Sequence, residues 1–287
     1  MMEKFCILTN KEKDENLLVT EQIRTFLLNN EKQVFVLVED FSTHKKDISL
    51  NQILLKEQPD CVIVLGGDGT MIRTANRLLG TKIPIFGINL GTLGFLTETE
   101  YPDMEQALQQ LFIGNYDIEQ RMMLSVKAPN DFYDTALNDV VITRNGFSRL
   151  ISVRIYVNEQ LVNVYRGDGV IVSTPTGATG YNLSAGGPVV MPNAELILIT
   201  PICPHTLNAR SIIVSSADSL KIIIEKEKKT QEEEAIVTVD GRSSEELQAE
   251  DCITIEKSEY MTYLVKLTNH TFFEILREKF RSRVEEG

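Results

Sequence analysis

The sequence of 287 residues contains no stretch that could cross a membrane. A membrane-spanning helix needs roughly 18 consecutive apolar residues, and no run here approaches that length. The opening segment MMEKFCILTNKEKDE places a short apolar patch directly before charged residues, so it lacks the basic and then apolar order of a secretion signal. We therefore expect a soluble, cytoplasmic protein with no membrane partner.

Cysteine and histidine are also scarce, with four and three residues respectively. The cysteines lie far apart, without the paired spacing of a zinc site or a redox dithiol. Three dispersed histidines give no basis for a His-centred metal site or a catalytic triad. We interpret the cysteines as reduced residues and expect no protein-held metal site.

Basic residues are outnumbered by acidic ones. The chain has 29 Lys and Arg against 41 Asp and Glu, which gives a net charge of -12. This excess of negative charge disfavours a polyanion, so we expect no nucleic-acid partner. Small anions remain possible ligands where glycine-rich loops and a metal ion provide the binding.

The first third of the chain alternates between strand-like and helical patterns. Such alternation predicts a Rossmann-like α/β fold, in which helices cover a parallel sheet. The predicted strands are residues 4–9, 34–38, 61–65 and 83–88, and the predicted helices are residues 15–28, 71–79 and 103–112, the last capped by Asp103.

From about residue 120 the helical period disappears, and short β-branched segments separated by turn signals predict a β-rich domain. At the end of the chain, Thr271 and Glu274 have the spacing of a capping box, and Phe272, Leu276 and Phe280 form one stripe of a closing helix. We therefore predict an α/β domain over 1–118, joined by 270–287, and a β-rich domain over 119–269. The predicted β segments are MMLSVK, TALNDVVITR, ISVRIYV, GVIVS, ELILI, SIIVS, LKIIIE, AIVTVD, CITIE and TYLVKL.

The stretch CVIVLGGDGT places one carboxylate, Asp68, among glycines after an apolar strand. Ligands of parallel sheets gather at the carboxyl ends of the strands, and glycines let backbone N–H groups approach a phosphate. No lysine follows the glycines, so this is not a Walker loop, and the dinucleotide fingerprint is absent too. Because a carboxylate would repel bound phosphate, Asp68 is expected to face a metal ion or a ribose hydroxyl. The alternative is an ordinary turn that uses Asp and Gly for their conformational freedom.

A second dense segment, RGDGVIVSTPTGATGYNLSAGGPVV, covers residues 166–190. Its glycines exclude a regular strand and predict an irregular loop or a short capped helix, whose hydroxyls suit ribose and phosphate oxygens. Asn138 and Asp139 interrupt the apolar segment ALNDVVI. Buried polar groups there would be costly unless something bonds them, which favours a ligand role.

Taken together, these motifs resemble the bacterial NAD kinase family. The motifs are GGDGT, NLGTLGFL, ALND, RGDGVIVSTPTGATGYNLSAGGP, ICPHTLNAR and VDG, in this order between about residues 61 and 242. GGDGT alone also occurs in diacylglycerol and sphingosine kinases, and phosphofructokinases have the same motif with Ser in place of Thr, but the long second motif separates this chain from them. The resemblance implies transfer of the γ-phosphoryl of ATP to the 2′-hydroxyl of the adenosine ribose of NAD, giving NADP. It further implies Mg²⁺ or another divalent cation arriving with ATP, and a homodimer or homotetramer formed through the β-rich domains.

The resemblance also assigns residues. It makes Asp68 the proton acceptor for the NAD hydroxyl, places Gly69 and Arg73 along NAD as well, and sets Phe95 beside the adenine. The remaining positions that it assigns to the dinucleotide are Asn138, Asp139, Arg149, Arg166, Asp168 at the nicotinamide end, Thr179, Gly180, Tyr181, Asn182, Leu183, Ser184 and Arg242. Phe95 could instead be a core aromatic, Arg166 a surface residue, and the Asp240-Gly241 pair a simple hairpin turn.

This chain departs from the family pattern at three of these positions. Asp139 stands where the family has Glu, Gly180 where it has Ala, and Arg242 where it has Gln. The shorter Asp139 implies a looser or water-bridged contact, and Gly180 a less rigid pocket. Two other functions stay open: a lipid or sugar kinase that shares GGDGT, and an NAD(P)-binding regulator without catalysis. Use of polyphosphate, acceptance of NADH and feedback by NADP are also left open.

Overall fold

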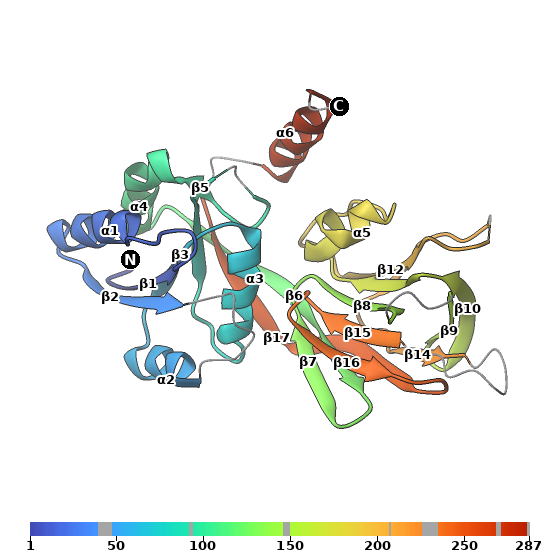
Figure 1. Ribbon diagram of the computed structural model, residues 1–287. Coiled ribbons are helices and arrows are strands. Elements are labelled where there is room, and N and C mark those ends of the chain that lie inside the picture. The colour runs from blue at the N-terminus through green and yellow to red at the C-terminus, as the bar shows by residue number, and fades with distance from the viewer. Residues whose placement is uncertain are drawn as a thin grey trace. The chain divides into compact units, whose positions relative to one another are not determined.

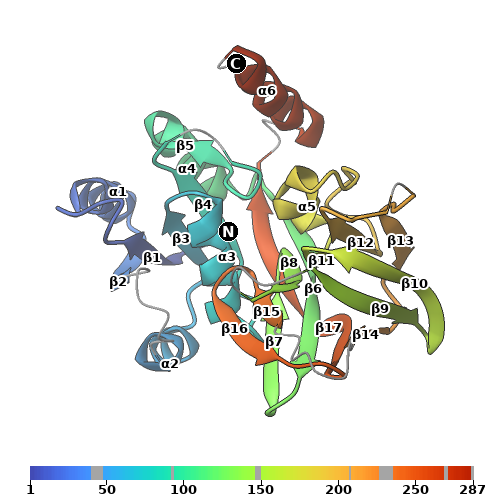
Figure 2. The same cartoon turned by 45° about the vertical axis from the view of Figure 1, so that its right-hand side comes forward.

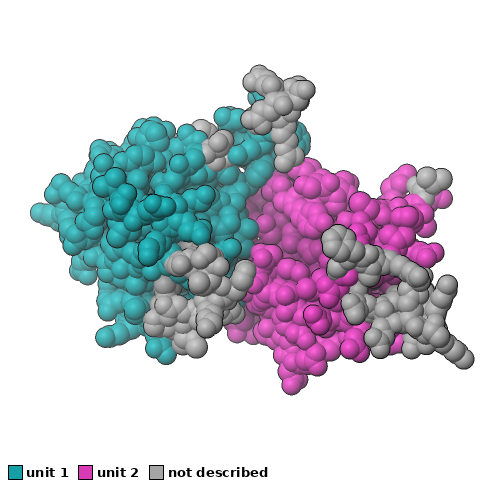
Figure 3. Space-filling model, in the orientation of Figure 1, with its two compact units in different colours: residues 1–120, 262–287 teal, residues 121–261 magenta. Residues whose placement is uncertain are grey.

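The computed structural model describes residues 1–39, 48–91, 94–145, 150–206, 208–225, 235–267 and 271–285. The chain forms two compact units, which Figure 3 colours separately. Unit 1 comprises residues 1–120 and 262–287, and unit 2 comprises residues 121–261. Among the described residues, no helix combines the length and the apolar character that a membrane crossing requires.

Unit 1 is built on a parallel sheet with the strand order β4-β3-β1-β2, which confirms the predicted α/β fold (Figure 1). The short strand β5 and the end of β17 pair parallel with β4. The elements are β1 (Lys4–Asn10), α1 (Leu18–Asn29), β2 (Gln33–Glu39), α2 (Ile48–Glu57), β3 (Cys61–Leu65), α3 (Asp68–Arg77), β4 (Ile85–Asn89), β5 (Thr99–Glu100), the 3₁₀ turn η1 (Tyr101–Asp103), α4 (Met104–Ile113) and α6 (Phe272–Glu285).

The core of unit 1 explains why these strands are nearly continuous apolar runs. All five residues of β3 and all five of β4 are buried, as expected where both faces of a parallel sheet are covered. One core cluster joins Phe5 of β1 to Leu27 of α1 and Leu111 of α4. The ring of Phe112 lies 6.0 Å from that of Phe5 and 6.1 Å from that of Phe26, so α1 and α4 pack together over β1.

The helices of unit 1 differ from the prediction at several points, and helix α1 begins at Leu18 rather than at residue 15. Helix α2 was not predicted. Helix α3 begins at Asp68 rather than at residue 71, because its first turn is formed by the glycine loop itself. Asp103 stands at the N-cap of α4 but makes no capping hydrogen bond through its side chain.

The predicted capping box at the closing helix is confirmed. The backbone N–H of Glu274 donates to Thr271 Oγ1 at 3.3 Å, and the Glu274 carboxylate accepts the Thr271 N–H at 2.8 Å. The predicted stripe is only partly right. Ile275 is buried, whereas Phe280 is 44% exposed.

Unit 2 is β-rich, as predicted, and its strands can be followed in Figure 2. One antiparallel sheet has the order β13-β12-β11-β8-β15-β16. A second set of antiparallel strands runs β10-β9-β14-β17, and β6 pairs with β17 and β7.

Both sets contribute alternate residues to a single core. Ile151, Val153 and Ile155 of β9 are buried in the same cluster as Val140 and Ile142 of β8. A spacing of two places these side chains on one face of each strand, which is the pattern of sheets packed face to face.

The elements of unit 2 include a short helical segment between two strands, as the glycine-rich stretch predicted. They are β6 (Asp117–Ala128), which starts in unit 1, β7 (Phe132–Ala136), β8 (Asp139–Arg144), β9 (Ile151–Val157), β10 (Gln160–Gly167), β11 (Gly169–Ser173), the 3₁₀ turn η2 (Thr176–Thr179), α5 (Tyr181–Ser184), β12 (Leu196–Ile202), β13 (Ile212–Ser215), β14 (Leu220–Ile224), β15 (Ala235–Val239), β16 (Ser243–Leu247) and β17 (Cys252–Lys266), which ends in unit 1.

Three strand assignments need correction. TALNDVVITR is not one strand, since β7 ends at Ala136 and β8 begins at Asp139. CITIE and TYLVKL are parts of the single strand β17. Strands β10 and β16 were not predicted, because half or more of their residues are polar or exposed and give no apolar run.

Candidate functional site

The loop GGDGT joins β3 to α3 and needs glycine at its first position. Gly66 has φ +154°, and a Cβ there would lie 2.9 Å from Thr70 Cβ. The Gly67 carbonyl accepts the first helical hydrogen bonds, from Thr70 N at 3.0 Å and Met71 N at 3.1 Å. The N-terminus of α3, with its free N–H groups and positive dipole, therefore lies at the carboxyl end of a buried parallel strand.

Asp68 is held in place by the second glycine loop of unit 1, the one that follows β4. Its Oδ2 accepts the backbone N–H of Phe95 and its Oδ1 accepts that of Leu96, each at 3.0 Å. The carboxylate retains lone pairs beyond these two bonds, so it can still accept a hydrogen from a ligand. The structure thus brings together two motifs that lie 27 residues apart in the chain.

Gly94 permits this arrangement. A Cβ added at Gly94 would overlap the Asp68 carboxylate, because it would lie only 2.6 Å from Asp68 Cγ. The Gly94 N–H donates to Thr97 Oγ1 at 2.9 Å, so the loop has little freedom to move aside.

We predict that Gly94→Ala displaces the Asp68 carboxylate and lowers kcat by about 100-fold, since ångström-scale misplacement of a reacting group costs that much. Gly91→Ala in the same loop is the matched control, because among the described residues a Cβ there meets only Asn89 Oδ1, at 3.8 Å. Steady-state kinetics of both variants test the prediction, and equal losses would mean that the loop, rather than the Asp68 contact, is what matters.

A pocket of about 330 Å³ opens in unit 1 beside this helix terminus. It carries two basic side chains, Lys13 and Arg73, so it suits an anion. The residues that line it are Asn10, Glu12 and Lys13 after β1, and Gly67, Gly69, Thr70 and Arg73 around the start of α3.

Asn10, Glu12 and Lys13 were not predicted as site residues. Asn10 ends β1, which pairs parallel with β3, so both strands deliver their carboxyl ends to the same edge of the sheet. The Asn10 side chain donates to Thr70 Oγ1 at 3.4 Å and accepts the Glu12 N–H at 3.0 Å. The polar run after the first strand was the available signal.

Phe95 lies half-buried in unit 1, with its ring 6.0 Å from that of Phe272 in α6. The ring therefore packs on the closing helix.

In unit 2, Asn138 lies in the break between β7 and β8, Asp139 is the first residue of β8, and Asn138 lies beside the segment TPTGATG. The Asn138 carbonyl accepts the Thr174 N–H at 2.9 Å, and a Cβ at Gly180 would lie 3.4 Å from Asn138 Nδ2. Among the described residues, Asn138 Oδ1 is buried without a hydrogen-bond partner. A buried amide oxygen of this kind is a candidate for binding a ligand donor.

The Asp139 carboxyl is buried close to a second carboxyl, that of Asp240. Burial, and then the charge of Asp240, raise the pKa of Asp139 to about 7. Burial also raises the pKa of Asp240, and this effect exceeds the opposite effect of the backbone N–H groups that donate to its carboxylate. Perturbed carboxyl groups of this kind are typical of functional sites, although buried structural networks produce them too.

The residues from Thr179 to Ser184 differ in their exposure. Tyr181 and Ser184 are exposed, and Thr179, Gly180 and Leu183 are half-buried. Burial, and then the charges of Cys203, Asp168 and Asp139, raise the pKa of Tyr181.

Asn182 is fully buried, in contrast to its neighbours. Its Nδ2 donates to the carbonyls of Ala178 and Pro188, at 3.2 and 3.1 Å, and its Oδ1 accepts the Thr200 hydroxyl at 2.7 Å. Asn182 therefore shapes the loop from inside.

The remaining predicted residues of unit 2 also occupy distinct environments. Asp168 is paired with Arg144, whose Nε lies 2.8 Å from Oδ1, and Arg144 was not predicted. Arg166 is exposed. Arg242 is bonded to Asp134, with its side chain 12% exposed. Arg149 lies outside the described residues.

Within the described ranges, no three His, Cys, Asp or Glu side chains form a group that could hold a metal ion. Mg²⁺ is commonly bound through one or two carboxylates together with the phosphates of a substrate. The lone carboxylate of Glu12 in the pocket fits that mode of binding, in which the nucleotide brings the ion.

Comparison with known proteins agrees with this geometry. The family model of the ATP-NAD kinase N-terminal domain matches residues 5–116, and that of the ATP-NAD kinase C-terminal domain matches residues 137–267. The NAD kinase of Lachnoclostridium phytofermentans is 53% identical over 97% of this chain and 99% of its own length. The NAD kinase of Caldanaerobacter subterraneus subsp. tengcongensis is 40% identical over 98% of this chain and 100% of its own length.

Two solved structures have the same fold. The NAD kinase of Archaeoglobus fulgidus in complex with ATP has a TM-score of 0.77 and 30% identity, covering 97% of this chain and 99% of its own. Yeast NADH kinase complexed with NADH has a TM-score of 0.83 at 23% identity, covering 97% of this chain and 88% of its own. The Asp68 loop, the pocket beside it and near full-length similarity to curated relatives lead to one conclusion: the chain belongs to the ATP-NAD kinase family.

Proposed function

We propose that this protein is an NAD kinase, which transfers the γ-phosphoryl of ATP to the 2′-hydroxyl of the adenosine ribose of NAD and releases NADP and ADP. The relatives named NAD kinase support the reaction. The observation that carries it is the Asp68 carboxylate, fixed at the start of α3 by Phe95 and Leu96 N–H groups and next to the glycines of an anion pocket.

Asp68 is the proton acceptor in this proposal. The 2′-oxygen forms a bond to the γ-phosphorus as the bond between that phosphorus and the β,γ-bridging oxygen breaks, and the hydroxyl proton passes to Asp68. General-base catalysis of this kind requires a carboxylate within hydrogen-bond reach of the hydroxyl. The two backbone N–H donors fix the direction of the carboxylate, so that it does not have to be ordered when substrate binds.

The pocket of unit 1 supplies the phosphate-binding groups. Lys13 and Arg73 provide positive charge, and the N-terminus of α3 contributes N–H donors and its dipole. Gly69 presents backbone without a side chain, so a phosphate can approach closely. A divalent cation bound with ATP would neutralise part of the phosphate charge, and Glu12 could contact it.

Lys13→Ala should raise the KM for ATP by about tenfold, because a charge-assisted hydrogen bond contributes roughly 1.5–3 kcal/mol. The KM for NAD should change less, since ATP carries more negative charge than NAD. Lys11→Ala removes the same charge from an exposed position two residues away that does not line the pocket. Initial rates with each substrate varied in turn test this, and an equal rise in both variants would show a general loss of charge instead of a specific contact.

The dinucleotide contacts are proposed for unit 2. The buried, unpartnered Oδ1 of Asn138 and the adjacent Asp139 are suited to the hydrogen-bond donors of adenine or ribose. Tyr181 and Ser184 are exposed and can contact the ligand directly, with Thr179, Gly180 and Leu183 shaping the surface beside them. Asp168 at the nicotinamide end, Arg149 and Arg166 remain proposed contacts.

Asn182 and Arg242 act differently in this proposal. The side chain of Asn182 forms its hydrogen bonds with other residues of the protein, and that of Arg242 is bonded to Asp134. We therefore assign both to holding the shape of the NAD site.

The deciding experiment incubates pure protein with NAD, ATP and Mg²⁺ and detects NADP with an NADP-specific dehydrogenase. NADP formation is expected. Binding of NAD without NADP formation would indicate a non-catalytic regulator, and ATP consumption only with a lipid or a sugar would indicate another kinase. Replacing ATP by polyphosphate, and NAD by NADH, defines the donor and the acceptor.

We also propose a homo-oligomeric, cytoplasmic enzyme. Strand β10 forms the edge of its sheet and exposes Leu161, Val162 and Val164, which suits association with a second copy. All four cysteines are unpaired, which is consistent with a reducing compartment.

A further inference from the structure

The hairpin turn between β15 and β16 contains Asp240 and Gly241, both in the left-handed region, with φ values of 48° and 63°. Asp and Gly suit that conformation, so the turn alone would explain their presence. The Asp240 side chain does more than this. It reaches away from its own hairpin, to the connection between β7 and β8 that presents Asn138 and Asp139.

Three consecutive backbone N–H groups converge on the Asp240 carboxylate. Leu137 N donates to Oδ2 at 2.9 Å, and Asn138 N and Asp139 N donate to Oδ1 at 2.8 and 3.1 Å. The Asp240 N–H in turn donates to the Asp139 carbonyl at 3.0 Å. Successive N–H groups that point to one acceptor make a compact anion-binding concavity in the backbone.

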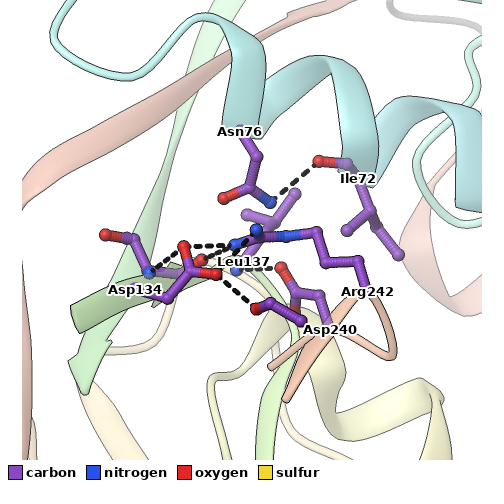
Figure 4. Close-up of polar contacts among 8 residues, drawn as sticks. Ile72, Asn76, Asp134, Leu137, Asp240 and Arg242 are labelled. Carbon is purple, nitrogen blue, oxygen red and sulfur yellow. Dashed lines mark hydrogen bonds and ion pairs between the residues drawn. The ribbon is translucent and has the colours of Figure 1, made fainter. Parts of the chain in front are cut away.

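Arg242 binds β7, the strand that precedes this connection. Its guanidinium donates to both oxygens of Asp134, each at 2.8 Å, and to the Thr135 carbonyl at 2.5 Å. The Ser243 hydroxyl also donates to Asp134. Figure 4 shows Asp240 and Arg242 side by side on their turn, with bonds to Leu137 and Asp134.

We propose that Asp240 is a positioning residue for NAD binding: by accepting the N–H groups of residues 137–139, it fixes the backbone that aims Asn138 and Asp139 at the dinucleotide. The proposal rests on the proposed function of unit 2 as the NAD site. Asp240 itself does not have to touch NAD.

Other side chains at position 240 would satisfy these N–H groups less well than the carboxylate does. An Asn side chain offers one acceptor oxygen and an NH₂ group that would face a backbone donor, so it can satisfy only part of the set. An Ala leaves all three donors unpaired. The Asp240 carboxylate serves this role although its negative charge repels that of the nearby Asp139 carboxylate.

The test compares Asp240→Ala, Asp240→Asn and Asp251→Ala by steady-state kinetics. Asp251 is the matched control, since its carboxylate accepts one turn N–H, that of Gln248 at 2.7 Å, in the same unit. Asp240→Ala should raise the KM for NAD by about ten- to a hundredfold while the KM for ATP changes less than about twofold. Asp240→Asn should fall between Asp240→Ala and wild type, and Asp251→Ala should match wild type.

A double-mutant cycle separates positioning from general destabilisation. If Asp240 acts through Asn138, the effects of Asp240→Ala and Asn138→Ala on the KM for NAD should be far from additive. Additive effects, an equal rise in the KM for ATP, or an unchanged KM for NAD would each overturn the proposal.

Hydrogen exchange tests the same claim without catalysis, and it separates failure of this proposal from failure of the proposed function. The amides of residues 137–139 should exchange faster in Asp240→Ala, while the amides in the centre of β11 keep their protection. Unchanged protection at residues 137–139 would overturn the positioning role. Absence of NADP formation by the wild-type protein would refute the kinase proposal and leave the exchange result standing.

Discussion

Asp68→Asn is expected to lower kcat by about 10²- to 10⁴-fold while NAD still binds, because the amide keeps the shape of the side chain but cannot accept the hydroxyl proton. The structure adds a second reason. Both carboxylate oxygens accept backbone N–H groups, from Phe95 and Leu96, and an amide can serve only one of them. The loop after β4 should therefore also become less ordered.

Single-turnover kinetics and NAD binding by calorimetry distinguish these effects. Asp103→Asn is the control, since Asp103 is an exposed carboxylate at the start of another helix in unit 1 and makes no side-chain capping bond. Its kcat should match that of the wild type. Retention of full turnover by Asp68→Asn would show that Asp68 is not the proton acceptor.

Asp139→Asn should raise the free energy of unfolding at pH 8 by up to about 4 kcal/mol while weakening NAD binding. The folded protein raises the pKa of Asp139 from 3.8 to about 7. A raised carboxyl pKa means that the folded state holds a proton which the unfolded state has lost. The stability contributed by this proton is complete below about pH 4 and is lost as the pH rises through about 7.

Denaturant unfolding of the wild type and of Asp139→Asn between pH 4 and pH 8 measures this effect. The difference should be small near pH 4, should grow up to about pH 7 and should then remain constant. Asp131→Asn, at an exposed turn position in unit 2, should track the wild type at every pH. A difference that does not depend on pH would mean that the Asp139 carboxyl does not titrate as described.

The fold was largely predictable because its signals are local. A buried parallel strand is a continuous apolar run, as in CVIVL, and a capping box such as Thr271 and Glu274 is a fixed spacing. Helix α2 was missed although its signals are local too: Asp47, a residue type favoured at helix N-caps, directly precedes the helix-compatible segment ISLNQILLKE.

The candidate site was predictable where a motif carries its own geometry, and much less so elsewhere. GGDGT could be placed after a strand, but the role of Lys13 depends on β1 pairing with β3, which sequence spacing does not reveal. Likewise, the motif around Tyr181 does not show which of its side chains face outward. Asn182 is buried and Tyr181 is 45% exposed, although the two are adjacent in an irregular segment without a regular period.

Strand β17 determines when unit 1 can complete its core during synthesis of the chain. Its first half pairs with β14 in unit 2, while Leu264 pairs with Ile85 of β4, and Val265 and Leu267 are buried in the core of unit 1. A nascent chain that stops before residue 262 therefore lacks part of the core of its own first domain. The amino-terminal domain, although synthesised first, can complete its core only after residues 265–267 have left the ribosome.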